Sequence, residues 1–165
     1  MKTIKLILFS LILASTGFSQ NLNIPSQYTL VTESDFDKYE HIATECAEFL
    51  ISTPLDKQTT LRKEASKFLI EYVSKSPTIS VEINQKATPF VTNADLLTIY
   101  IASWVKSYSA QNHANNKEEF TIRAANEALN FYTANKSNID KIKGIKKFLK
   151  LQADNKLDDY IKTNL

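Results

Sequence analysis

Apolar residues recur along most of the chain at intervals of three and four, which is the spacing of one face of an α-helix. The most regular stripe lies between residues 57 and 75 and stops before Ser76-Pro77, where the proline disfavours further helix. Similar stripes run through residues 34–53, 94–108 and 117–132, and a last one runs from residue 138 to the C-terminal end, with one glycine inside it. The pattern therefore predicts five or six helices joined by short loops.

Polar residues with helix-capping character stand at the start of these stripes. The expected N-caps are Ser34, Asp56, Thr92 and Asn116. Three of them are followed three positions later by an acidic residue, which is favoured at the positive end of a helix. These positions set the expected helix starts.

Two short segments alternate polar and apolar residues instead, as a half-buried strand does. They are residues 28–32 and 78–83. Even if they pair, a single ribbon does not make a β domain. The expected fold is mainly α, an irregular bundle of five or six helices with one short β ribbon as an option. This helical domain spans residues 34–165 and follows an extended segment over residues 20–33.

The first nineteen residues have the three parts of a secretory signal peptide. Lys2 and Lys5 are positive, residues 4–14 are apolar, and Gly17 and Ser19 are the small residues of a cleavage site after Ser19. The apolar part is shorter than the ~20 residues that span a bilayer. We expect an exported protein, periplasmic or extracellular, with an uncleaved anchor as the alternative.

Loss of the signal peptide changes the charge of the chain. The full sequence has 20 Lys and Arg against 18 Asp and Glu, and cleavage removes two lysines. The mature chain is then close to neutral, which withdraws the usual electrostatic support for non-specific nucleic-acid binding. We expect no nucleic-acid partner.

Residues 94–108 form the most apolar run of the mature chain and contain the only tryptophan. Its apolar part, residues 96–105 with Thr98 and Ser103 inside it, is too short to cross a bilayer, so we expect no integral membrane segment in the mature chain. A helix that is apolar on most sides is usually central in a bundle. The alternative is a pocket for a small apolar ligand, lined by Tyr100, Trp104 and Tyr108.

Several motifs that carry chemistry are missing from the sequence. After cleavage Gly144 is the only glycine, which excludes glycine-rich phosphate and dinucleotide loops, and we expect no cofactor. His41, Glu45 and Glu48 share a helical face without HExxH or CxxC, so we expect a solvated face and no metal. Cys46 has apolar neighbours and is expected to be a buried thiol, with an intermolecular disulfide as the alternative.

A hydrolase would have to be built from dispersed residues. It would need Cys46 or a carboxylate in a cleft near His113. No GxSxG motif is present, and His41 and Cys46 diverge on a helix because they are five positions apart. An enzyme is therefore the less favoured class, and no catalytic residue is assigned.

Charge is unevenly spread along the chain. Residues 33–48 have a net charge of −5 and residues 136–150 a net charge of +5. The second region contains a basic amphipathic helix over residues 139–151, which can either pack with its lysines solvated or meet an anionic surface or partner. The candidate residues for an anionic partner are Lys141, Lys143, Lys146, Lys147 and Lys150. The two charged regions can also face each other within the fold or across a homodimer.

The order of LRKEASKFLIEYVSKSPTISVEI, TNADLLTIYIASWVKSY and NKLDDYI resembles a group of uncharacterised small secreted proteins of Gram-negative bacteria. The likeness covers residues 55–165 and is a pattern of apolar positions. It implies a signal peptide followed by a compact helical domain, and it transfers no activity and no functional residue.

The sequence thus predicts a secreted or periplasmic non-enzymatic helical protein that binds a protein, an envelope component or a small ligand. Its positive feature is the polarised charge. The alternative is a carrier for a small apolar ligand near Trp104, and a hydrolase is less favoured than either.

Overall fold

A computed structural model describes residues 22–114 and 116–165, so the predicted signal peptide lies outside the described residues. The described chain contains six α-helices, one 3₁₀ helix and no strand, which confirms the mainly α bundle. The helices are α1 (Glu33–Ser52), α2 (Thr59–Lys75), η1 (Pro89–Thr92), α3 (Ala94–Ala110), α4 (Lys117–Ala134), α5 (Ile145–Ala153) and α6 (Leu157–Asn164).

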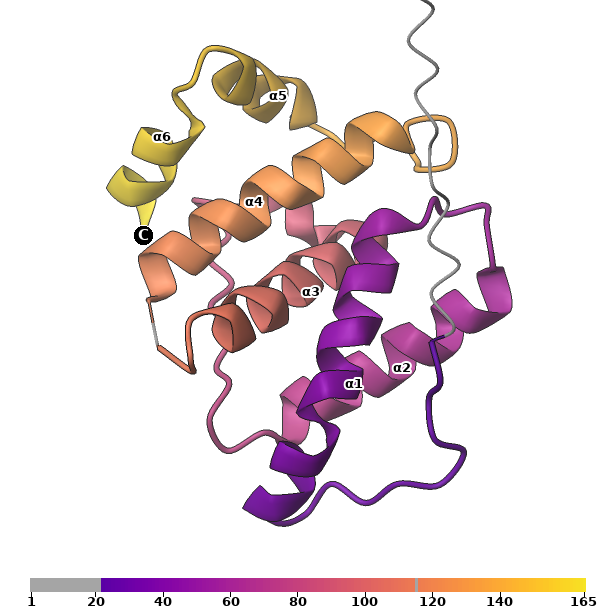
Figure 1. Ribbon diagram of the computed structural model, residues 1–165. Coiled ribbons are helices and arrows are strands. Elements are labelled where there is room, and N and C mark those ends of the chain that lie inside the picture. The colour runs from indigo at the N-terminus through magenta and orange to yellow at the C-terminus, as the bar shows by residue number, and fades with distance from the viewer. Residues whose placement is uncertain (1–21, 115) are drawn as a thin grey trace, which may run out of the picture.

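Helix α3 lies at the centre of the bundle. Helices α1 and α4 pack on it, α2 packs on α1, and α5 and α6 lie on the outer side of α4 (Figure 1). Nine of the side chains of α3 are buried, as the sequence predicts for a helix that is apolar on most sides. None of the helices in the described part is long and apolar enough to cross a bilayer.

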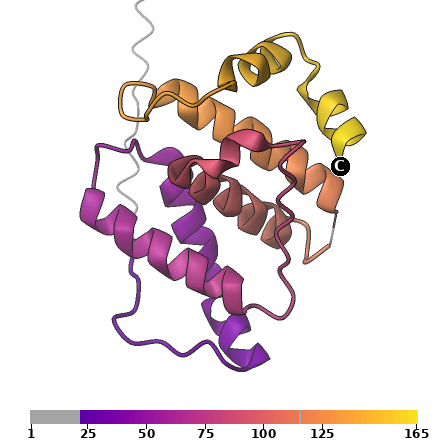
Figure 2. The same ribbon diagram turned by 180° about the vertical axis from the view of Figure 1, so that it is seen from behind.

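The optional β ribbon does not form. Residues 28–32 pack on α1 and α2, where the Tyr28 hydroxyl donates to the Glu71 carboxylate at 2.7 Å and the Tyr28 ring meets Phe68 edge-on. Residues 78–83 run along another part of the molecule (Figure 2), where the Glu82 carbonyl accepts from the Tyr100 hydroxyl at 2.8 Å. The alternation therefore reflects packing on helices, because Leu30 and Ile79 are buried between exposed neighbours and the described residues contain no strand.

Two helix starts differ from the predicted caps. Helix α1 begins earlier, because Thr32 rather than Ser34 is its N-cap and forms a reciprocal capping box with Asp35. Helix α3 begins later, because Thr92 is the last residue of η1 and Asn93 accepts hydrogen bonds from two backbone N–H groups of the first turn.

Of the other two predicted caps, one is confirmed and one is wrong. Asn116 caps α4 as predicted, and its side-chain oxygen accepts from the N–H of Glu119 at 3.2 Å. Asp56 does not cap α2, because Gln58 stands before the helix in the left-handed conformation with φ +46°. The Asp56 carboxylate lies 3.2 Å from the ammonium of Lys57 instead.

The predicted basic helix over residues 139–151 is only partly helical. Residues 135–144 form turns and a loop, and α5 begins at Ile145. Gly144 separates the two parts with φ +81°, a conformation that glycine adopts far more easily than other residues. Helix and loop together return the chain across the end of α4.

We call α5 and α6 the C-terminal arm. Its Phe148 ring lies edge-on to Phe90 of η1 and to Tyr160 of α6, with centroids 5.2 and 5.6 Å apart. The Gln152 side chain donates to the Asn126 side chain of α4 at 3.0 Å. Aromatic packing and amide hydrogen bonds therefore hold the arm on the bundle.

Candidate functional site

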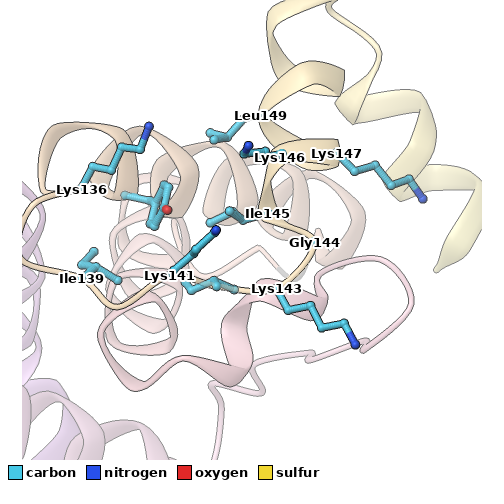
Figure 3. Close-up of a pocket in the computed structure, with 11 residues that line it drawn as sticks. Lys136, Ile139, Lys141, Lys143, Gly144, Ile145, Lys146, Lys147 and Leu149 are labelled. Carbon is cyan, nitrogen blue, oxygen red and sulfur yellow. The ribbon is translucent and has the colours of Figure 1, made fainter.

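A concave surface of about 600 Å³ lies between the end of α4, the loop over residues 135–144 and the start of α5 (Figure 3). We call it the basic hollow. It is lined by Tyr132, Lys136, Ile139, Lys141, Ile142, Lys143, Gly144, Ile145, Lys146, Lys147 and Leu149.

The floor of the basic hollow is apolar. Ile139 and Ile145 are 6% and 3% exposed, and Ile142 and Leu149 are half-buried. The loop before Gly144 brings Ile139 and Ile142 beside Ile145 in the first turn of α5. A continuous helix would not bring them together in this way. An apolar group placed here would leave water on one side and meet aliphatic side chains.

The rim of the hollow is made of exposed lysines, and none of its 11 lining residues is acidic. Lys136, Lys141 and Lys146 stand around the floor, whereas Lys143 and Lys147 extend away from it (Figure 3). The Lys147 ammonium lies 4.4 Å from the centre of the Tyr160 ring, so part of its interaction is made within the arm.

These lysines keep their positive charge free of carboxylate partners. The salt bridges found over residues 22–114 and 116–165 include none of the rim lysines. The first turn of α5 also has no acidic residue and no side-chain cap, so the partial positive charge of the helix end adds to the same field. Like charges gathered over an apolar floor favour an anion with an apolar part.

Two other hollows differ in their charge. One of about 370 Å³ between α2 and α3 contains Asp95 beside Arg62 and Lys63. Another of about 450 Å³ on α3 and α4 contains Glu127 and Asp158 beside its basic residues. Because both mix acids and bases, neither has the uniform sign of the basic hollow.

Four of the five lysines predicted to meet an anionic partner line this hollow. The fifth, Lys150, is exposed on α5 but is not part of the lining. Two lining residues were not among the predicted site residues: Tyr132 near the end of α4 and Lys136 in the loop that follows it. Lys136 belongs to the +5 region, so charge alone could have found it, whereas Tyr132 carries only the signal of a core residue.

The three aromatic candidates for an apolar pocket lie in the core. Tyr100, Trp104 and Tyr108 are 0%, 2% and 9% exposed, and none of them lines the hollows described above. The Trp104 ring meets Phe120 edge-on at 5.4 Å, and its indole N–H has no hydrogen-bond partner in the described part of the chain. This placement favours core packing, and a pocket at these rings stays a prediction.

A polar cluster joins α1 to the turn between α3 and α4. The Glu40 carboxylate accepts from the Ser109 hydroxyl at 2.6 Å and lies 2.8 Å from Nε2 of His113. Burial raises the pKa of Glu40, but these two hydrogen bonds and the charge of His113 outweigh it, and the pKa is lowered. Since Glu40 stands between the other two, the imidazole does not contact the hydroxyl as the general base of a serine nucleophile must.

Cys46 is completely buried. Burial, with a smaller contribution from Glu45, raises the pKa of its thiol to about 12. The thiolate form that a nucleophile needs is therefore disfavoured. His113 contacts Glu40 at the surface instead of the buried thiol. Among the described residues, no group of three or more His, Cys, Asp and Glu side chains could hold a metal ion.

The acidic and basic regions lie at opposite ends of the molecule. The acidic start of α1 and the basic start of α5 are far apart in both views (Figures 1 and 2). No salt bridge joins them within residues 22–114 and 116–165. The two regions therefore do not neutralise each other within one chain, and a contact across a homodimer stays a prediction.

No protein-family model, no curated protein and no solved structure matches this chain. The resemblance to small secreted proteins accordingly stays a prediction.

Proposed function

We propose that this chain is an exported, non-enzymatic binding protein and that the basic hollow binds an anionic ligand with an apolar part. The observation that carries the proposal is the combination of an apolar floor with a rim of lysines in one concave surface. Ligand sites are commonly apolar hollows with a few polar groups that fix the orientation of the ligand.

The two parts of the hollow have different tasks. The floor around Ile139, Ile142 and Ile145 supplies affinity, because apolar surface is removed from water when a ligand covers it. The ammonium groups of Lys136, Lys141 and Lys146 supply selection for negative charge. Their attraction is partly screened by salt because the rim is exposed.

Two observations support a binding role over catalysis. The hydroxyl of Ser109 and the imidazole of His113 both contact Glu40 rather than each other. Cys46 is inaccessible in the core. Export is supported by the sequence of residues 1–19, and peptide mass spectrometry of the protein from a periplasmic extract should find an N-terminal peptide that begins at Gln20.

The first test uses the anionic dye anilinonaphthalene sulfonate, whose emission rises in apolar surroundings. We expect saturable binding of one dye per chain that weakens about tenfold in the double variant Lys136→Glu/Lys141→Glu and weakens with added salt. Lys63→Glu/Lys67→Glu, at two exposed lysines on α2, is the charge-matched control and should bind the dye as the parent does.

The proposal is overturned if the double variant binds the dye as tightly as the parent or if the parent does not bind it. The neutral probe phenylnaphthylamine separates the alternative. Tight binding of that probe, unaffected by the lysine variants and accompanied by a change in Trp104 emission, would favour the carrier with a pocket near Trp104.

A further inference from the structure

We infer that the ligand of the basic hollow is a free single-chain amphiphile, with one acyl chain ending in an anionic head group. This inference rests on the proposed function and names its ligand class. The acyl chain would lie on the floor formed by the isoleucines, and the head group would meet the lysines of the rim (Figure 3).

The shape of the hollow favours a small flexible chain. Its volume of about 600 Å³ falls within the usual range of small-molecule sites. Ile139, Ile142, Ile145 and Leu149 form an aliphatic floor that offers contact area without hydrogen-bond partners. Such a floor suits methylene groups, whereas a ligand body with many polar atoms would lose its hydrogen bonds to water there.

The rim selects charge more than the shape of the head group. Lys136, Lys141 and Lys146 provide ammonium groups on flexible stems, and a lysine acts as a point charge rather than as a rigid fork. A carboxylate and a phosphate can both be held by such a rim. The shared chemistry is therefore an anionic head group at the end of one chain.

A bilayer fits the same surface less well. A helix that lies on a membrane inserts a protruding apolar face between lipids. On α5 the apolar side chains Ile145 and Phe148 are buried and Leu149 is half-buried. The large apolar side chains that are exposed in the described part of the chain are Val31, Ile70, Ile83 and Leu165, none of them on α5.

The test is competition of saturated fatty acids with the bound dye, below their micelle concentrations. Octanoate, decanoate and laurate should displace it with a Kd that falls about fourfold for each added methylene, which is the burial of ~0.8 kcal/mol per methylene converted by RT. Dodecyl phosphate should bind at least as tightly as laurate, because its head group carries about −1.5 to −2 charge at neutral pH and the rim attracts negative charge. Dodecanol should bind about tenfold more weakly than laurate.

Variants locate the site of competition. Lys136→Glu/Lys141→Glu should weaken laurate binding about tenfold, whereas the charge-matched control Lys63→Glu/Lys67→Glu should leave it unchanged. Ile142→Ser should reduce the gain per methylene, because it removes part of the floor. Since Ile142 is half-buried, urea unfolding of this variant checks that it keeps the fold.

The outcomes separate the two levels of the proposal. Dye binding at the hollow without displacement by any fatty acid, or displacement that does not depend on chain length, overturns the single-chain ligand and leaves the anion-binding function standing. Tight binding to phosphatidylglycerol vesicles that free laurate does not compete with overturns it in favour of a bilayer. Absence of dye binding overturns both.

Discussion

Gly144 stands where the loop of the basic hollow turns into α5. A β-carbon added at this position would meet no atom within 4 Å, so space does not require a glycine. The backbone does, because φ is +81°. Residues with a β-carbon pay about 1–2 kcal/mol for this conformation.

We therefore expect Gly144→Ala to lower the free energy of unfolding by about 1 kcal/mol, because the reduced freedom of the unfolded chain offsets part of the backbone cost. Urea unfolding followed by circular dichroism measures the difference. Gly144→Asn should lose less, since asparagine tolerates the left-handed region. An alanine variant as stable as the parent would contradict the assignment of φ as the cause.

Arg62 is a second residue whose role depends on its surroundings. Its side chain is only 7% exposed, although a charged residue of a helix usually lies at the surface. Its guanidinium donates to the carbonyls of Leu50 and Thr53 at the end of α1 and lies 5.4 Å from the centre of the Phe131 ring. Burial lowers the pKa of Arg62, and the charge of Asp95 offsets part of that shift.

Replacement of Arg62 by methionine should lower the free energy of unfolding by about 2–3 kcal/mol, since two carbonyls at a helix end lose a charged donor. Arg62→Lys should recover part of this loss, because one ammonium cannot reproduce the spread of the guanidinium donors. Lys63→Met, at the exposed neighbouring position, is the control and should stay within about 0.5 kcal/mol of the parent in urea unfolding. Equal effects at both positions would contradict the capping role.

At the scale of the elements, apolar spacing was sufficient to place α1 to α4, but it wrongly extended the fifth helix over residues 139–144, which form a loop. The ends of the helices were less predictable, because a cap depends on which neighbouring residue turns its oxygen toward the first N–H groups. Thr32 and Asn93 do so, although Ser34 and Thr92 have similar chemistry. Neighbouring candidate caps differ little in free energy, so tertiary packing decides which of them begins the helix.

The sequence predicted the charge of the basic hollow but not its concave shape. Charge counting found four of its lysines, but the periodicity of Ile139, Ile142 and Ile145 also fits one face of a helix. Only the left-handed turn at Gly144 converts that stripe into a loop and a helix that face the same space. The distance between a loop and the helices beside it is not encoded in a repeat, so the concavity could not be predicted from the sequence.

The turn between α3 and α4 contacts α1 through His113. Its residues Asn112 and His113 both have positive φ, at 49° and 65°. The His113 ring stacks on Tyr108 with centroids 4.8 Å apart, and Nε2 contacts Glu40 of α1. The contact with Glu40 ties this strained turn to the bundle.

Glu40 should make stability depend on pH in a defined direction. Its pKa is lowered in the folded state, so the unfolded chain binds more protons and folding is favoured as pH rises. This contribution is complete above about pH 5 and is lost as pH falls through the lowered pKa. We expect Glu40→Gln to be less stable than the parent at neutral pH, with a difference that closes on acidification.

Urea midpoints of parent and variant between neutral and acidic pH measure this difference. Glu64→Gln, on the exposed side of α2, is the control for the loss of one carboxylate. A gap between parent and Glu40→Gln that stayed constant across the acid range would show that the carboxylate acts through packing rather than through its charge.

At the scale of the whole molecule, one core joins helices from both ends of the chain. Cys46 of α1 and Trp104 of α3 belong to the same cluster of buried residues, which extends to Phe148 and Ile161 of the C-terminal arm. The polarised charge and the basic hollow lie on the outside of this core. Substitutions at the rim should therefore change binding without changing the fold, because the rim lysines are exposed.

A single core also predicts that Cys46 and Trp104 report the same event. The thiol is fully buried, and burial raises its pKa to about 12. It should therefore not react with the thiol reagent dithiobis(nitrobenzoate) until the chain unfolds. Trp104, at 2% exposure, should emit at short wavelength in the folded state and shift to longer wavelength on unfolding. Thiol labelling and tryptophan emission should give coincident transitions in urea, as a two-state domain requires. Labelling at urea concentrations that leave the emission unchanged would show that α1 opens separately. In a different measurement, a dimer that is lost on reduction would support the intermolecular disulfide at Cys46.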